Sequence, residues 1–354
     1  MAAFTPNGLP LLIGSLPLDD HTRALDLVFD HTPDIPLWVQ LPKFREEGMI
    51  RQFLYGLPGV DQKNDTYLIN SQGRQFDEEF VRFFEDYISL SEPGADYKTS
   101  RFAFTTLTGK GFFHFLDRVD RNPRRFAALK GQVTGPVTFC TAVKDEAGRD
   151  IFYHDQLRDA AVKRLAMNAR WQAKEFAKRG ATPIIFLDEP ALAGFGTSAY
   201  ITITRADVQA CIEEIVQEIH AENGLAGVHV CANTEWDLLL DTNIDIISFD
   251  AFSYFDKFIL YPKAIRKFLG RGGILAWGIV PTADENLISQ QTSGGLAEKL
   301  TDQIRQVADL GIPMDTVTAR SFVTPSCGTG SLSPASAIRV LSLTKAVSEQ
   351  IRAW

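Results

Sequence analysis

A histidine and two cysteines are the residues of this chain whose types and spacing could do chemistry. His229 and Cys231 stand two residues apart at the end of an apolar run, and Cys327 follows another such run 96 residues after Cys231 (327 − 231 = 96). Residues i and i+2 of a β-strand point to the same face, so His229 and Cys231 would project together. Imidazole and thiolate are ligands that Zn²⁺ prefers, and a catalytic zinc site has three protein ligands and one open position.

The elements that must position these residues are short apolar runs that alternate with amphipathic segments. Eight runs stand out, starting at Leu11, Leu37, Ala127, Pro183, Gly227, Ile244, Gly273 and Arg320. Between them lie helical patterns such as 155–180, ended by Gly180, and 204–224, capped by Thr204. This alternation is typical of βα units, so the sequence predicts an α/β fold, a (β/α)8 TIM barrel. We expect a single domain over residues 1–354.

One stretch, from about residue 61 to 120, breaks the alternation after the second predicted strand. It is rich in Phe and Tyr with mixed charge. We expect it to be an insertion, a hairpin with helices, that covers the barrel mouth.

Composition excludes several classes of protein. The chain has 354 residues, 45% of them hydrophobic, and its formal net charge of -8 argues against nucleic acid as a partner. The N-terminus has no basic leader, and no run approaches the roughly 20 apolar residues of a membrane helix, so we expect a cytoplasmic protein with no membrane partner. Only 4 cysteines, widely spaced, suit reduced thiols better than disulfides.

Polar side chains gather at the carboxyl ends of the predicted strands, where the active sites of such barrels form. They are Ser15, Gln132, Thr134, Asp188, Glu189, His229, Cys231, Asp250 and Cys327. We interpret His229, Cys231 and Cys327 as metal ligands, with Asp250 as a fourth, replaceable one. Asp188 and Asp250 are the candidate catalytic residues, and Ser15, Gln132, Thr134, Asp188 and Glu189 the candidate substrate-binding ones.

The other cysteines and histidines fit simpler explanations. We expect Cys140 and Cys211 to be small buried hydrophobes. The histidines outside the motif, which we expect at the surface or at helix caps, are His21, His31, His114, His154 and His220. The turn "GTGS", residues 328–331, could cradle a phosphate, but it is equally explained as a tight turn.

Several short motifs, taken together, resemble one superfamily. They are "IGSLP" at Ile13, "VTGPVTF" at Val133, "FLDEPAL" at Phe186, "HVCANT" at His229, "IISFD" at Ile247 and "PSCG" at Pro325. In this order they resemble the cobalamin-independent methionine synthases and their relatives in the uroporphyrinogen-decarboxylase-like superfamily, including the corrinoid:thiol methyltransferases. The resemblance covers almost the whole chain and corresponds to the C-terminal half of methionine synthase.

The resemblance implies a role for several residues. His229, Cys231 and Cys327 would bind Zn²⁺, Asp250 stands where methionine synthase has a ligand Glu, and Ser15 and Asp188 match residues that hold the amino-acid part of homocysteine. A zinc-bound thiol is deprotonated near neutral pH and becomes the nucleophile. The implied partner is therefore a small thiol, with homocysteine, which yields methionine, as the expected substrate.

The departures from the family concern the substrates. Folate-using members carry a Trp after "TGPVT" and a His near the seventh strand, whereas this chain has Ala142 and "GIVPTADE". Both differences favour a methyl-corrinoid donor, carried by a partner protein, over methyltetrahydrofolate. Lys43 and Arg45 stand in the stretch where the family has a Glu for the homocysteine amine, which leaves the acceptor open.

Three alternatives stay open at this stage. The donor could be methyltetrahydrofolate, bound through other contacts. The chain could be a decarboxylase-like or phosphate-binding barrel without metal, or a binding protein without turnover. Metal content separates the methyltransferases from the last two.

Overall fold

The fold is built on a curled parallel sheet of six strands, shown by a computed structural model that describes residues 4–63, 66–92, 97 and 99–353. In spatial order the strands are β3 (Ala128–Thr134), β5 (Thr182–Asp188), β6 (Leu225–Val230), β7 (Ile246–Phe249), β8 (Ile274–Val280) and β9 (Ser321–Pro325). All neighbouring pairs are parallel. Each matches one of the eight apolar runs of the sequence.

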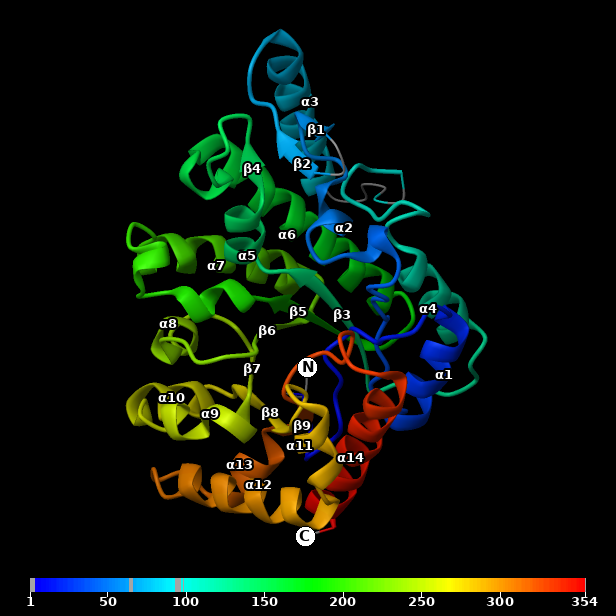
Figure 1. The fold of residues 1–354 in the computed structure, drawn as a ribbon, viewed down its shortest axis with the longest axis vertical. Coiled ribbons are helices and arrows are strands. Elements are labelled where there is room, and N and C mark those ends of the chain that lie inside the picture. Colours follow the sequence, from blue (N-terminus) through cyan, green and yellow to red (C-terminus); the bar gives the residue numbers. More distant parts are fainter. Residues whose placement is uncertain (1–3, 64–65, 93–96, 98, 354) are drawn as a thin grey trace.

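Helices form a ring around this sheet (Figure 1). Parallel strands need crossover connections, and helices supply them. The α-helices of the ring are α1 (His21–His31), α4 (Lys110–Asp120), α5 (Pro136–Ala142), α6 (Asp155–Ala177), α7 (Arg205–Ala221), α8 (Trp236–Leu240), α9 (Ala251–Phe258), α10 (Pro262–Gly270), α11 (Glu285–Gln290), α12 (Ser293–Ala308), α13 (Met314–Ala319) and α14 (Pro334–Arg352). Short 3-10 helices occupy 45–47, 151–153, 190–194 and 198–200.

The first two predicted strands are extended segments rather than regular strands. Segment 9–16 forms two backbone hydrogen bonds with Val323 of β9, one as donor and one as acceptor. Segment 36–41 forms two such bonds with Lys130 of β3. The two segments also bond to each other, through Gln40 N and Gly14 O at 3.1 Å.

Prolines reduce the number of backbone donors in these segments. Pro10 lies in the first segment and Pro36 begins the second, and a proline has no N–H to donate. The structure therefore confirms a TIM-like α/β fold, but its regular sheet is not the closed eight-strand barrel that the sequence predicts.

Side chains inside the curl of the sheet form a small apolar cluster of their own. Its buried members come from strands, from segment 9–16 and from the residue just before segment 36–41, and none comes from a helix: Leu11, Ile35, Ala128, Ile184, Phe186, Ile246, Ile274, Ala276 and Phe322. Because side chains alternate along a strand, residues two and four positions further on point the same way. Lys130, Asp188, Ser248 and Thr324 therefore face the interior, nearer the carboxyl ends of their strands.

The stretch 61–120 contains a hairpin and helices, as the sequence predicts. Strands β1 (Val60–Lys63) and β2 (Thr66–Ile69) pair antiparallel, and β2 pairs with β4 (Lys144–Asp145). The helices α2 (Arg51–Leu54) and α3 (Arg74–Ser91) flank this hairpin, and in Figure 1 the hairpin and α3 project from one side of the ring. That the insertion covers the barrel mouth stays a prediction.

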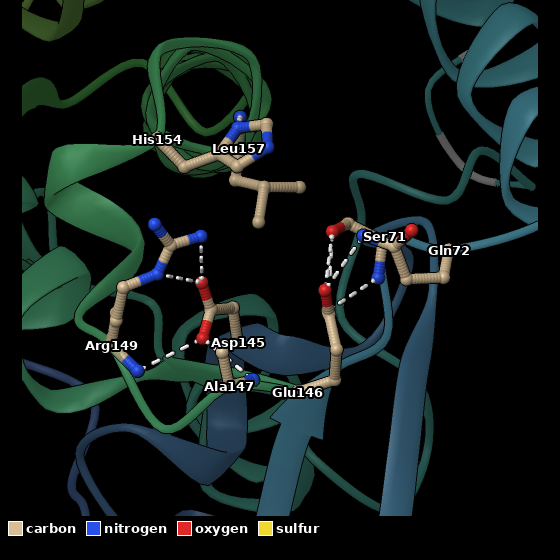
Figure 2. Close-up of polar contacts among 8 residues, drawn as sticks. All are labelled: Ser71, Gln72, Asp145, Glu146, Ala147, Arg149, His154 and Leu157. Atoms are coloured by element: carbon tan, nitrogen blue, oxygen red, sulfur yellow. Dashed lines mark hydrogen bonds and ion pairs between the residues drawn. The ribbon is translucent and has the colours of Figure 1, made fainter.

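A carboxylate fastens the hairpin to the loop after β4. Glu146 accepts hydrogen bonds from Ser71 N and Gln72 Nε2, both at 2.9 Å, and from the Ser71 hydroxyl (Figure 2). These bonds lower the pKa of Glu146 to about 2. Asp145, the last residue of β4, accepts from the backbone N–H groups of Ala147 and Arg149 in this loop.

Helix ends confirm the capping signals of the sequence. Thr204 and Asp207 form a capping box at the start of α7, and His154 accepts from Leu157 N at the start of α6. Gly180, just beyond α6, has a φ of 72°, a left-handed conformation that glycine adopts without strain. Of the helices described, none is both long and apolar enough to span a bilayer.

Candidate metal centre

Four strands bring their carboxyl ends to the candidate site. Asp188 of β5 is in register with His229 of β6, and His229 with Ser248 of β7. Cys231 follows β6 directly, and Cys327 lies two residues beyond β9. Gly278 of β8 lets these ends approach, because a Cβ there would lie 2.5 Å from Phe249 O.

The three predicted ligands meet. One nitrogen of His229 and the Sγ atoms of Cys231 and Cys327 all lie within 4.8 Å of one another, and this is the one such group of three or more His, Cys, Asp or Glu side chains among the residues described. The histidine is buried and both cysteines are partly exposed. One nitrogen and two sulfur donors suit Zn²⁺ and leave a fourth tetrahedral position free.

His229 is prepared for this role by its surroundings. Its Nδ1 lies 3.0 Å from the hydroxyl of Ser248, whereas its buried Nε2 has no hydrogen-bond partner in the described part of the chain. Burial, helped by the charge of Lys130, lowers the pKa of His229 to about 3. The imidazole is therefore neutral, and if Nδ1 carries the proton that Ser248 accepts, the Nε2 lone pair is free for a metal.

The two thiols affect each other's pKa. The Cys327 thiol donates a hydrogen bond to Cys231, which lowers the pKa of Cys231 and raises that of Cys327. The backbone N–H of Gly328 also bonds to the Cys327 sulfur. One of the two sulfurs is thus already close to the thiolate form that a metal binds.

Asp250 lies beside this group rather than in it. Its carboxylate is not among the donor atoms within 4.8 Å of one another, and it caps α9 by accepting from Ser253 N at 2.8 Å. Burial raises the pKa of Asp250 against these hydrogen bonds. Its metal-binding and catalytic roles stay predictions.

Asp188 faces the site with an unused acceptor. Its Oδ1 is buried and has no partner among the residues described. Burial raises the pKa of this carboxyl, and the nearby ammonium of Lys130 opposes the rise. The carboxylate is available for a donor group of a bound molecule.

The other predicted substrate-binding residues already have protein partners. Ser15 Oγ accepts from Gly330 N at 3.2 Å, and Gln132 donates to Trp38 O at 3.2 Å while its Oε1 stays unpartnered within the described chain. The Thr134 hydroxyl donates to Met49 O. Ser15 and Gln132 retain capacity for a ligand, whereas Thr134 fastens the loop after the second segment.

Glu189 holds a helix instead of facing the site. Its buried carboxylate accepts from Val137 N, Thr138 N and the Thr138 hydroxyl at 2.6–2.9 Å, at the N-terminus of α5. Burial raises the pKa of Glu189 to about 7 despite these bonds. A Cβ on Gly135 would lie 2.1 Å from the Glu189 carboxyl carbon, so this position needs glycine.

The "GTGS" turn is closed on Ser15. Thr329 N donates to Ser15 O at 3.0 Å and Gly330 N to Ser15 Oγ. These two amides are therefore already used, which favours the tight turn over a phosphate cradle.

Two inward-facing residues of the site do not stand out in the sequence. Lys130 and Ser248 lie inside apolar runs, and only strand alternation, two positions before Gln132 and Asp250, would point to them. Cys140 and Cys211 are buried, as predicted.

The prediction that His21 lies at the surface or caps a helix is wrong, since the N-cap of α1 is Asp20. His21 is 4% exposed and lies 2.6 Å from the Glu47 carboxylate. It is the first residue of α1, packed against Phe44 and His114.

Comparison with known proteins gives a relationship of fold. No protein-family model and no curated protein matches the chain. Solved structures do match, among them a protein from Listeria monocytogenes proposed to be a vitamin-B12 independent methionine synthase. The match has a TM-score of 0.56 and 12% identity, and it covers 97% of this chain and 98% of the other. At this identity the likeness shows a shared fold.

Proposed function

We propose that this chain is a zinc-dependent methyltransferase that moves a methyl group from a methyl-corrinoid donor to a small thiol, with homocysteine as the expected acceptor. The observation that carries the proposal is the convergence of His229, Cys231 and Cys327 at the carboxyl end of the sheet. The unpartnered Nε2 of His229 fits a ligand atom better than a structural imidazole. The fold shared with the Listeria protein supports a methionine-synthase-like methyltransferase, whereas the corrinoid donor rests on other observations.

Different residues of the site would bind the metal and the acceptor. Zinc held there would supply the positive charge that turns a thiol into a thiolate at neutral pH. Ser248 fixes the orientation of the His229 ring, and Asp188 Oδ1 is free to accept from the acceptor's ammonium group. The Ser15 hydroxyl, held by Gly330 N, can donate to a carboxylate.

The transfer itself balances without an acid. The acceptor sulfur would form a bond to the methyl carbon while the cobalt–carbon bond of the donor breaks. The electron pair of the broken bond would stay on the corrinoid. A folate amine, by contrast, must be protonated to leave. Ala142 is exposed at the end of α5, and loop 281–284 after β8 contains no histidine, so these two positions supply neither an aromatic platform nor an imidazole acid for a folate.

Metal content is the first test. The purified protein should bind about one zinc per chain, and Cys231→Ser and Cys327→Ser should each lose most of it while the protein stays folded. Cys211→Ala, which removes a thiol outside the site, is the matched control and should keep its zinc. Full zinc retention in both site variants would refute the metal centre.

Donor choice is the second test. Methionine formation from homocysteine is measured anaerobically with methylcobalamin and with methyltetrahydrofolate, using Cys327→Ser as the blank. We expect turnover with methylcobalamin, and slower turnover with the folate by on the order of 100-fold or more, the usual effect of a missing general acid. Equal or faster turnover with methyltetrahydrofolate would establish the folate as donor.

A further inference from the structure

A buried lysine lies in the interior of the sheet, below the candidate metal centre. Lys130 is 0% exposed, its Nζ donates to Ile13 O at 2.7 Å, and it lies 4.3 Å from the centroid of the Phe186 ring. In the described part of the chain, no carboxylate lies within 4.0 Å of this ammonium. A buried cation without an ion pair costs free energy, so its presence calls for a compensating role.

The position of Lys130 points to that role. Phe186, whose face covers the ammonium, is two residues before Asp188 on the same inward face of β5. Lys130 faces the same interior from β3, the strand that pairs with β5. The ammonium therefore lies where it influences the site without touching the proposed ligands.

The charges expected in the proposed site indicate a role for the Lys130 ammonium. Two thiolates cancel the charge of Zn²⁺, so an acceptor thiolate, together with Asp188, would leave negative charge in the sheet interior. We propose that Lys130 is a positioning residue whose buried ammonium offsets this negative charge and thereby allows the acceptor to bind as a thiolate beside Asp188. This inference rests on the proposed function.

A second lysine supplies a matched control. Lys299 of α12 donates to Phe252 O at 2.8 Å and lies 3.8 Å from the centroid of the Phe252 ring. It repeats the two contacts of Lys130 outside the interior of the sheet. If Lys130 only filled space and bonded a carbonyl, the two lysines would respond alike to replacement.

The experiment measures acceptor binding rather than turnover. The wild type, Lys130→Met and Lys299→Met are loaded with Co²⁺, and homocysteine is titrated while the thiolate-to-cobalt charge-transfer band is followed. We expect Lys130→Met to bind one metal and to raise the Kd for homocysteine on the order of 10-fold, the effect of one lost buried charge. Lys299→Met should change the Kd less than Lys130→Met does, because Lys299 is only partly buried and solvent screens its charge more strongly.

Each result decides. An unchanged Kd in metal-loaded Lys130→Met would overturn the inference while leaving the proposed function intact. Absence of the band in the wild type would refute the proposed function, and the inference with it.

If Lys130→Met loses its fold or its metal, Lys130→Met/Asp188→Asn removes both charges and metal content is measured again. Recovery of metal supports charge balance as the role of Lys130. No recovery overturns it.

Discussion

The hydrogen bond between Ser248 and His229 allows the metal centre to be tested without touching a ligand. In Ser248→Ala the hydroxyl that lies 3.0 Å from His229 Nδ1 is lost. Both residues are buried, so water cannot easily replace it. We expect the variant to fold and to bind zinc more weakly.

The size of the effect follows from burial. Leaving a buried donor unpaired costs about 1–3 kcal/mol, and each 1.4 kcal/mol is a factor of ten in affinity. Loss of the residue behind a ligating histidine typically costs 10–100-fold in metal affinity, which agrees with that range. The Kd for zinc should therefore rise by about 10- to 100-fold.

The assay is a competition for zinc against a chelator of known affinity. Thr324→Val is the matched control, because Thr324 is also a buried hydroxyl facing the interior, yet its Oγ1 has no partner in the described structure. It should leave zinc affinity within about twofold, since the hydroxyl contributes no hydrogen bond to lose. Equal affinities of Ser248→Ala and wild type would refute the assignment of His229 as a ligand held through Nδ1.

Three further variants test neighbouring features. Glu189→Gln should lower the free energy of unfolding, measured by urea denaturation, by about 1–3 kcal/mol because the group that caps α5 loses an acceptor oxygen. Zinc should be retained, and zinc loss in the folded variant would indicate that Glu189 belongs to the metal site. Gly328→Ala places a Cβ 2.2 Å from Ser15 Oγ and should weaken zinc binding by moving Cys327; Ser15→Ala should restore it, and no rescue would contradict this account. Glu146→Gln should lower stability by at most about 1 kcal/mol because the group is exposed. Because the pKa of Glu146 is lowered, its contribution to stability is full above about pH 4.5 and is lost as the pH falls through about 2. Hydrogen exchange at the Ser71 amide should therefore distinguish wild type from variant at about pH 7 more than at about pH 2. The same difference at both pH values would contradict the role of the carboxylate.

Much of the site is predictable from strand alternation and parallel pairing. His229 and Cys231 share a face because they are two residues apart, and Cys327 joins them because all the strands end at one edge of the sheet. The same alternation separates Asp188 from Glu189, which are adjacent and therefore point to opposite sides. Glu189 accordingly reaches α5 and not the interior.

Other features depend on packing that no local pattern records. His21 begins an amphipathic helix, which predicts a position at the surface or at the helix cap, but the distant Glu47 pairs with it in a buried contact. Prolines at the first two apolar runs signal weak ladders, while the bonds that tie those runs to β3 and β9 depend on the curl of the whole sheet. The order of βα units is therefore easier to predict from the sequence than the fact that two of the eight apolar runs form extended segments instead of regular strands.

The distance along the chain between the ligands has a consequence for biosynthesis. Ribosomes add about 5–20 residues per second, so roughly 5–20 s separate the appearance of Cys231 from that of Cys327. During this interval the nascent chain holds two of the three proposed ligands, and the groups of segment 9–16 that bond to Val323 of β9 lack their partner. An exposed edge of this kind is prone to pair with other chains. Metal binding by the three proposed ligands would therefore be a late event in the life of the protein, and we expect zinc supplied after synthesis, rather than during it, to find the complete site.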